Sequence, residues 1–368
     1  MANVDAFLCN HAAGLCEAYM PFNRSLVVIA STRYEIGRHE PSRWREWNAN
    51  LVKIASHPRN VVAANNRFDA EYIKYFTGIQ NVPVFPNYCG YTGVTYKPTR
   101  PQFLVGPGRG ISDLLLKQLL AAAARTPGAP EFKRIRDLCV CAHAAHARAR
   151  AEATSLCLHL VRASPLTRPP FFARRYNHFE YSDLAAHPAI VLLPYQISLM
   201  SIFEYYRMNI PMYAPTPRLL ASWQVKHRVL NELTWDLVFK KAARGSPLPR
   251  HPSVPASVPD PNDQANEAGL AYWLKFADFY EWPHIDTFDS WDELLTKIKA
   301  ADLDAVSAKM AAHNTQMKDG LLGDWNAAFH RMFNGVPPAR TKPRPLQPNF
   351  DVAMKENYGT VVAPGCNG

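Results

Sequence analysis

Short apolar runs alternate with longer amphipathic segments over the first hundred residues. Residues 4–8 and 25–31 are rich in aliphatic and β-branched side chains, which is typical of strands buried on both faces of a parallel sheet. Residues 41–56 begin with a proline and carry apolar side chains at helical spacing. The predicted order is strand 4–8, helix 12–20, strand 25–31, helix 41–56, strand 60–64, a capped helix ending at Gly78, and strand 82–89. This alternation over residues 1–98 predicts a parallel sheet covered by helices.

A second alternating region follows residues 95–101, whose prolines and cations predict a linker. The run QFLVGPGRG reads as a strand that enters a glycine-rich turn, and a strong helix starts after it at Ser112 or Asp113. Further elements are expected as strands 189–196 and 210–215 and as helices 198–208, 218–243, 269–281, 290–300 and 302–333. The chain is therefore predicted to be an α/β protein with domains over residues 1–98 and 99–335.

Three stretches break this periodicity. Residues 139–173 have no clean period, and without them FKRIRDL would run through a natural helix–loop–strand into the next element. We interpret them as a retained intron, which sequencing of the mature transcript tests. Residues 245–268 are proline-rich and predict a mobile insertion. The basic, proline-rich tail 336–368 is predicted to be disordered.

Composition adds few constraints. The chain has 368 residues, 48% of them hydrophobic, and a net charge of +10. This charge suits a polyanion, but no nucleic-acid motif accompanies it, so we expect a basic surface and no nucleic-acid partner. The seven cysteines are scattered, which favours a reducing compartment over a disulfide framework.

The targeting and metal signals are weak. We find no signal peptide and no apolar run long enough for a membrane span. This fits a cytoplasmic location, or a Golgi association if an anchor precedes the chain. Cys139, Cys141, His143 and His146 lack a standard zinc spacing, so no metal site is expected.

The glycine-rich turn is the first candidate site. Gly106, Gly108 and Gly110 follow a strand and precede a helix, where backbone N–H groups and the helix terminus attract anions. Arg109 would reach the same phosphates. A plain tight turn is the alternative.

The second candidate site follows strand 189–196. Ser198 and Ser201 lie on the first turns of the expected helix, and Ser201 shares a face with Glu204. A carboxylate beyond the carboxyl edge of a parallel sheet accepts two hydrogen bonds from the vicinal hydroxyls of a ribose. A solvated helix acid is the alternative.

The spacing of Ser201, Glu204 and Pro211 resembles the donor-binding signature of nucleotide-sugar glycosyltransferases of the GT-B architecture. VVAANNRFDAEYIKYFTGI resembles the close of that family's N-terminal domain, and PTRPQFLVGPGR resembles the start of its C-terminal domain. WLKFADFYEWPHIDTFDSWDELLTKI resembles the closing segment. The resemblance covers residues 1–335 outside 139–173 and 245–268. It implies two Rossmann-like lobes, of which the N-terminal one is short and incomplete.

The resemblance also implies a function. A UDP- or GDP-linked sugar would be transferred to a hydroxyl of a glycan, lipid or protein, with Glu204 on the ribose and the Gly106–Gly110 turn on the diphosphate. No metal or other cofactor would be needed, since Arg109 and the helix terminus offset the leaving-group charge. A binding protein of the same fold with impaired catalysis is the alternative, and a basic nucleic-acid-binding protein is less favoured.

The chain departs from the family pattern at two positions. Gln196 stands where retaining members carry a second glutamate, and Asn209 stands where a glycine is usual. The stereochemical outcome is therefore left open. An inverting enzyme needs a general base in the N-terminal lobe, and His11, His39 and Glu40 are the candidates because they follow the first two strands.

Overall fold

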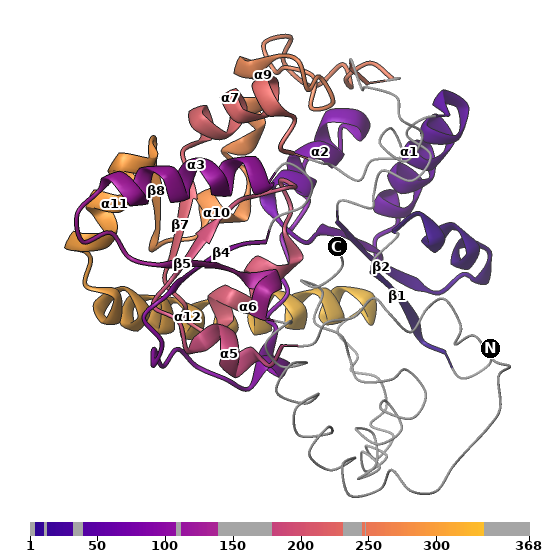
Figure 1. Ribbon diagram of the computed structural model, residues 1–368. Coiled ribbons are helices and arrows are strands. Elements are labelled where there is room, and N and C mark those ends of the chain that lie inside the picture. The colour runs from indigo at the N-terminus through magenta and orange to yellow at the C-terminus, as the bar shows by residue number, and fades with distance from the viewer. Residues whose placement is uncertain are drawn as a thin grey trace, which may run out of the picture.

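The computed structural model forms two parallel β-sheets flanked by helices, so the predicted mixed α/β class is confirmed (Figure 1). The described residues are 4–10, 13–31, 40–107, 112–138, 179–230, 245–246 and 248–334. The predictions for residues 139–173 and for the tail 336–368 concern residues outside this described part.

The first sheet is formed near the N-terminus. Its strands are β1 (Ala6–Asn10), β2 (Ser25–Ala30) and β3 (Val61–Ala64). They pair in parallel in the order β1-β2-β3, with Leu8 opposite Val27 and Val28 opposite Val62. The connecting elements are the 3₁₀ helix η1 (Ala13–Phe22) and the helix α1 (Pro41–Ser56), and α2 (Arg67–Thr77) follows β3.

Helix α1 packs its apolar stripe on this sheet, as the spacing predicted. Trp44, Trp47 and Leu51 are fully buried, and Trp44 packs against Tyr72 and Phe76 of α2. Helix α2 is capped by the Asn66 side chain and ends at Gly78.

The strand predicted over residues 82–89 is wrong. Among the described residues, this segment makes a single parallel bridge, between Ala64 and Val84. The flanking Pro83 and Pro86 have no N–H group to donate, so a longer ladder cannot form there. The segment after it ends in the short 3₁₀ helix η3 (Gly90–Thr92).

The second sheet carries five described strands in the order β5-β4-β6-β7-β8, all parallel. Its strands are β4 (Phe103–Gly106), β5 (Phe132–Arg134), β6 (Ile190–Leu192), β7 (Met212–Pro215) and β8 (Ile285–Phe288). Its helices are α3 (Ser112–Arg125), α5 (Tyr181–Ala185), α6 (Met200–Arg207), α7 (Pro217–His227), α9 (Glu267–Leu274), α10 (Asp278–Glu281) and α11 (Trp291–Ala300). Strand β5 lies where the sequence predicted a helix. Helices α3 and α6 lie on opposite faces of this sheet (Figure 1).

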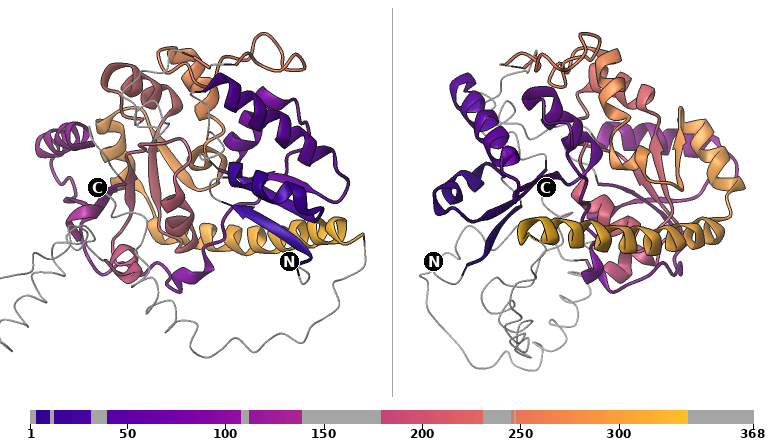
Figure 2. Two further views of the ribbon diagram at one scale, coloured as in Figure 1. Left: turned by 90° about the vertical axis from the view of Figure 1, so that its right-hand side faces the viewer. Right: turned by 180° about the vertical axis from the view of Figure 1, so that it is seen from behind.

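The long helix α12 (Leu303–Met332) joins the two sheets. It starts beside the second sheet, where it packs on α6, and then crosses to the first sheet (Figure 2). Ala328 and Met332 pack there against Val27, Ile29 and Val61. The Ser25 hydroxyl also donates to the Met332 carbonyl at 3.1 Å. One face of the N-terminal sheet is therefore covered by a helix from the other end of the described chain.

Residues 245–268 contain no described helix before α9, as expected, but they are held in place by hydrogen bonds. His251 N donates to the Tyr75 carbonyl at 2.7 Å, and the Trp273 indole donates to the Pro259 carbonyl at 2.9 Å. The Asp260 carboxylate accepts from Ser246 N at 2.6 Å.

The structure also corrects the expectation for cysteine. Cys9 on β1 is disulfide-bonded to Cys16 on η1, whose Cα atom is 5.7 Å away. Scattered spacing alone did not reveal this pair, because it depends on the packing of β1 against η1. None of the described helices combines the length and apolar character needed to cross a bilayer.

Candidate functional site

The strand order of the second sheet reverses between β4 and β6. Successive strands β4 and β5 run to one side, and β6, β7 and β8 run to the other. In open parallel sheets, ligands bind beyond the carboxyl ends of the strands at such a reversal, because the two outgoing loops diverge there. The outgoing loops here are the turn after Gly106 and the segment after Leu192, which meet where Leu193 N donates to the Gly106 carbonyl at 3.4 Å. Both candidate motifs therefore start from this reversal.

Gly106 ends β4 with a backbone that requires glycine. Its φ is +149°, and a Cβ atom there would lie 3.2 Å from the Ile135 side chain. Glycine adopts this backbone conformation without the strain that a Cβ atom would add. Gly108, Arg109 and Gly110 lie outside the described residues.

The loop after β6 reaches the carboxyl end of the first sheet. Asn66 Nδ2 donates to Ser198 Oγ at 2.6 Å, and Asn65 Nδ2 contacts Met200 Sδ at 3.4 Å. Both asparagines directly follow β3, so the outgoing ends of the two sheets face each other here. Ser201 Oγ and Asn65 Oδ1 are buried and have no hydrogen-bond partner within the described part of the chain. A hydroxyl and a carbonyl oxygen at this junction are therefore left without an internal hydrogen bond.

The sequence predicts only a capped helix start at these two asparagines. Asn66 is that cap, since its Oδ1 accepts from Asp69 N at 2.8 Å, but its Nδ2 also bonds across to the other sheet. Their position directly after a buried strand was the available signal, because polar residues there lie at the ligand-binding edge.

Glu204 is buried on α6, with 2% of its surface exposed. Its Oε1 accepts hydrogen bonds from the hydroxyls of Tyr91 on η3, at 2.6 Å, and Tyr181 on α5, at 2.7 Å. Burial raises the pKa of the Glu204 carboxyl, and the two tyrosine hydrogen bonds oppose that rise. The carboxylate thus already accepts two hydroxyl groups, both on Oε1.

Tyr91 lies over Glu204 on the outside of the molecule. It is 66% exposed although its hydroxyl bonds to a buried carboxylate. Its short 3₁₀ helix stands between Cys89 and Gly93, both of which have positive φ. Burial and the Glu204 carboxylate raise the pKa of Tyr91. Of the two tyrosines that donate hydrogen bonds to Glu204, Tyr91 is therefore the exposed one.

Comparison with known proteins found no relative of this chain. No family model, no curated protein and no solved structure matches the chain.

The remaining predicted residues are divided between the two sheets. Gln196 is half-buried in the loop between β6 and α6, close in sequence to Ser198. Glu40 is exposed at the start of α1, where its carbonyl accepts from Trp44 N and its side chain makes no capping bond. His11 and His39 lie outside the described residues. Ser201 and Glu204 lie on α6, but the prediction that Ser198 lies on its first turn is wrong, because the helix begins at Met200. Glu40 lies apart from them, beside the first sheet.

Asn209 has a backbone reason to replace the glycine of the family pattern. Its φ is +60°, a region that asparagine tolerates better than most residues. Its side chain also accepts from Asn314 Nδ2 of α12 at 2.6 Å. This position therefore holds α12 against the turn between α6 and β7, which a glycine would not do.

Among the described residues, no group of three or more histidine, cysteine, aspartate or glutamate side chains is arranged to hold a metal ion.

Proposed function

We propose that this chain is a nucleotide-sugar glycosyltransferase with two Rossmann-like lobes, the N-terminal one small. The observation that carries the proposal is that both donor-binding motifs leave the sheet at the strands between which the order reverses. The facing of the two carboxyl edges through Asn66 and Ser198 supports a cleft between lobes. The return of α12 to the first sheet ties these lobes together.

In this proposal the donor diphosphate lies against the turn from Gly106 to Gly110, and Arg109 offsets its charge without a metal ion. The ribose hydroxyls bind Glu204 by taking the place of the Tyr91 hydroxyl. Ser198, Ser201 and Gln196 line the loop beside them. Because Tyr91 is largely exposed, it can leave this position without unpacking the core.

The acceptor would bind on the side of the first sheet. Its hydroxyl oxygen attacks the anomeric carbon of the donor sugar, and the bond from that carbon to the diphosphate breaks. The diphosphate leaves with the bonding electron pair. If the reaction inverts the anomeric carbon, His11, His39 or Glu40 takes the hydroxyl proton. UDP- and GDP-linked sugars are the donor classes proposed, and a glycan, lipid or protein is the acceptor.

Nucleotide binding is the direct test. We compare UDP and UDP-sugars with GDP and GDP-sugars. We expect both sets to raise the melting temperature of the full chain, and the set that contains the nucleotide of the true donor to raise it more. Release or transfer of the sugar, followed by chromatography, then separates an active enzyme from a catalytically impaired nucleotide-binding protein. No response to any nucleotide or nucleotide sugar would overturn the proposal.

Replacing Tyr91 with phenylalanine is expected to tighten nucleotide binding roughly 10- to 100-fold. The variant removes the hydroxyl that competes with the ribose for Glu204, and a hydrogen bond to a charged group contributes roughly 1.5–3 kcal/mol. Calorimetric titration measures the change. Tyr181→Phe is the matched control, because its half-buried ring stays in place and we expect no gain in affinity. Weaker binding in Tyr91→Phe would contradict the displacement of Tyr91.

A further inference from the structure

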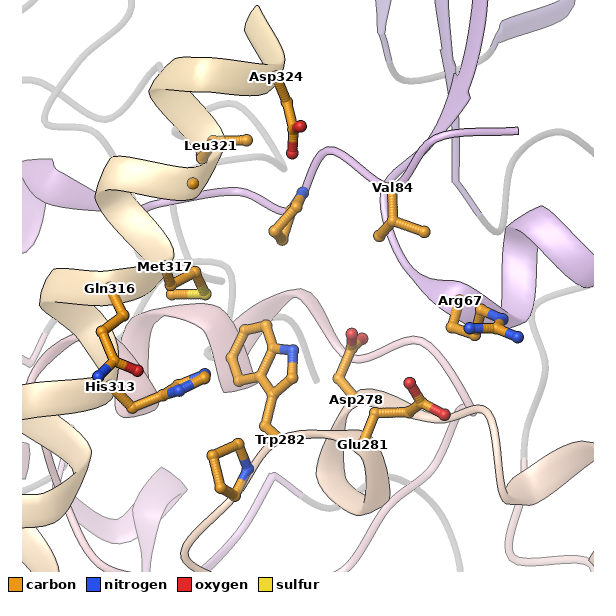
Figure 3. Close-up of a pocket in the computed structure, with 13 residues that line it drawn as sticks. Arg67, Val84, Asp278, Glu281, Trp282, His313, Gln316, Met317, Leu321 and Asp324 are labelled. Atoms are coloured by element: carbon orange, nitrogen blue, oxygen red, sulfur yellow. The ribbon is translucent and has the colours of Figure 1, made fainter. Parts of the chain in front are cut away.

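A separate cavity lies between α10, α12 and the start of α2 (Figure 3). Its volume is about 510 Å³, within the range of small-molecule sites. None of the residues that line it belongs to the candidate site described above. Its charged and aromatic lining residues are Arg67, Asp278, Glu281, Trp282, His313 and Asp324.

Asp278 is the unusual member of this set. It is 3% exposed, and its carboxyl group points into the cavity (Figure 3). Its Oδ2 has no hydrogen-bond partner among the residues that the structure describes. Burial, followed by the charge of Glu281, raises the pKa of Asp278 well above its usual range. A buried carboxyl oxygen without a partner costs free energy, so a ligand that pairs with Oδ2 is favoured.

The rest of the lining carries an excess of negative charge. Glu281 and Asp324 are exposed acids at the cavity. The single arginine of the lining, Arg67, is already paired with Glu71 through Nε and Oε1 at 2.9 Å. Burial lowers the pKa of His313, which favours its neutral form. In a chain of net charge +10, this is a local reversal of sign.

An aromatic ring completes the cavity. Trp282 is half-buried and held edge-on by Phe203 and Tyr206, so its position is fixed by packing. Its indole lies between Asp278 and His313 in Figure 3. Aromatic faces attract ammonium groups, and they also pack against the alkyl chains that carry them.

We propose that this cavity binds a small organic cation of the aliphatic diamine or polyamine class. One ammonium group pairs with Asp278, and the alkyl chain lies along Trp282. A second ammonium group is paired with Asp324, which faces the cavity from α12. A neutral polyol of the same length would leave both carboxylates without a charged partner.

The test is calorimetric titration of the full chain with 1,4-diaminobutane and, as its neutral match, butane-1,4-diol. We expect binding of the diamine and at least tenfold weaker binding of the diol. Asp278→Asn should weaken diamine binding at least tenfold. Asp319→Asn, which changes an exposed acid of α12 outside the cavity, should leave it within twofold. Diamine binding that is absent, equal to diol binding or unchanged in Asp278→Asn would overturn the proposal.

Two further measurements separate binding from folding. Asp324→Asn changes an exposed residue, so the variant should fold normally. It should weaken the binding of 1,4-diaminobutane more than the binding of propylamine, which has one ammonium group. Affinity for the diamine should rise with pH, because binding requires Asp278 to lose its proton. The other groups that face Asp278 are Glu281, Arg67, His313 and Asp324, and they are unchanged in Asp278→Asn, whose affinity should depend less on pH. Equal pH profiles in the two proteins would contradict the pairing with Asp278.

Discussion

Replacing Ala328 with aspartate is expected to lower the free energy of unfolding by about 3–5 kcal/mol, because it buries a carboxylate without a partner. Ala328 is 5% exposed and packs against the outer face of the N-terminal sheet. That face depends on α12 for its cover, so the substitution separates the helix from β2 and β3. Urea denaturation followed by tryptophan fluorescence measures the loss.

The neighbouring alanine gives a matched control. Ala327 lies on the same turn of α12 but is exposed. Ala327→Asp has the same change in helix propensity and charge, so we expect a loss below about 1 kcal/mol. Proteolysis should cut the N-terminal unit faster in Ala328→Asp alone. Equal stability of the two variants would show that α12 is not needed to cover the sheet.

Helix α12 also shows what the local sequence pattern can predict and what it cannot. The helix was predicted almost to the residue, because apolar and helix-forming residues persist over 302–333. Its packing was not predicted, since a helical period says which face is buried but not against what. The N-terminal lobe was interpreted as incomplete for a different reason, since residues 1–98 hold too few strands for a full Rossmann-like lobe. One face of its sheet is covered by Ala328 and Met332, some 300 residues later in the chain.

Strand β5 was not predicted for a different reason. It lies at the edge of the second sheet and pairs with β4 alone among the described strands. All three of its residues, Phe132, Lys133 and Arg134, are half-exposed. Charged residues are tolerated at a sheet edge, so the run carries neither the continuous apolar pattern of a central strand nor a long alternation.

The sequence predicts which loops form the candidate site, but it does not predict which side chains bond to Glu204. The turn after Gly106 and the loop carrying Ser198 leave neighbouring parallel strands, and such loops emerge at the same edge of a sheet. The hydroxyls that occupy Glu204 come from Tyr91 and Tyr181, on two other segments. No spacing in the sequence relates these segments, because only the tertiary fold brings them together.

Replacing Glu204 with glutamine is expected to weaken nucleotide binding roughly 10- to 100-fold, because hydrogen bonds to a charged acceptor contribute roughly 1.5–3 kcal/mol. Glutamine keeps the shape and a carbonyl oxygen for Tyr91 and Tyr181, so the fold should persist. Titration with the nucleotide that stabilises the wild-type chain measures the loss. Glu267→Gln, an exposed change on α9, should bind as the wild type does. Unchanged affinity in Glu204→Gln would remove Glu204 from the donor site.

The pH dependence of stability gives an independent check on the same side chain. Burial raises the Glu204 pKa above its ordinary value of 4.5, so the folded protein keeps this proton to higher pH than the unfolded chain does. Between those two pKa values the folded state binds more protons, and its stability therefore falls as the pH rises. Glutamine has no proton to lose. The stability of Glu204→Gln relative to the wild type should therefore increase as the pH rises from 4.5 through the raised pKa. A difference that stayed constant with pH would mean that the pKa of Glu204 is the same in the folded and the unfolded chain, so that the hydrogen bonds from Tyr91 and Tyr181 fully offset the effect of burial.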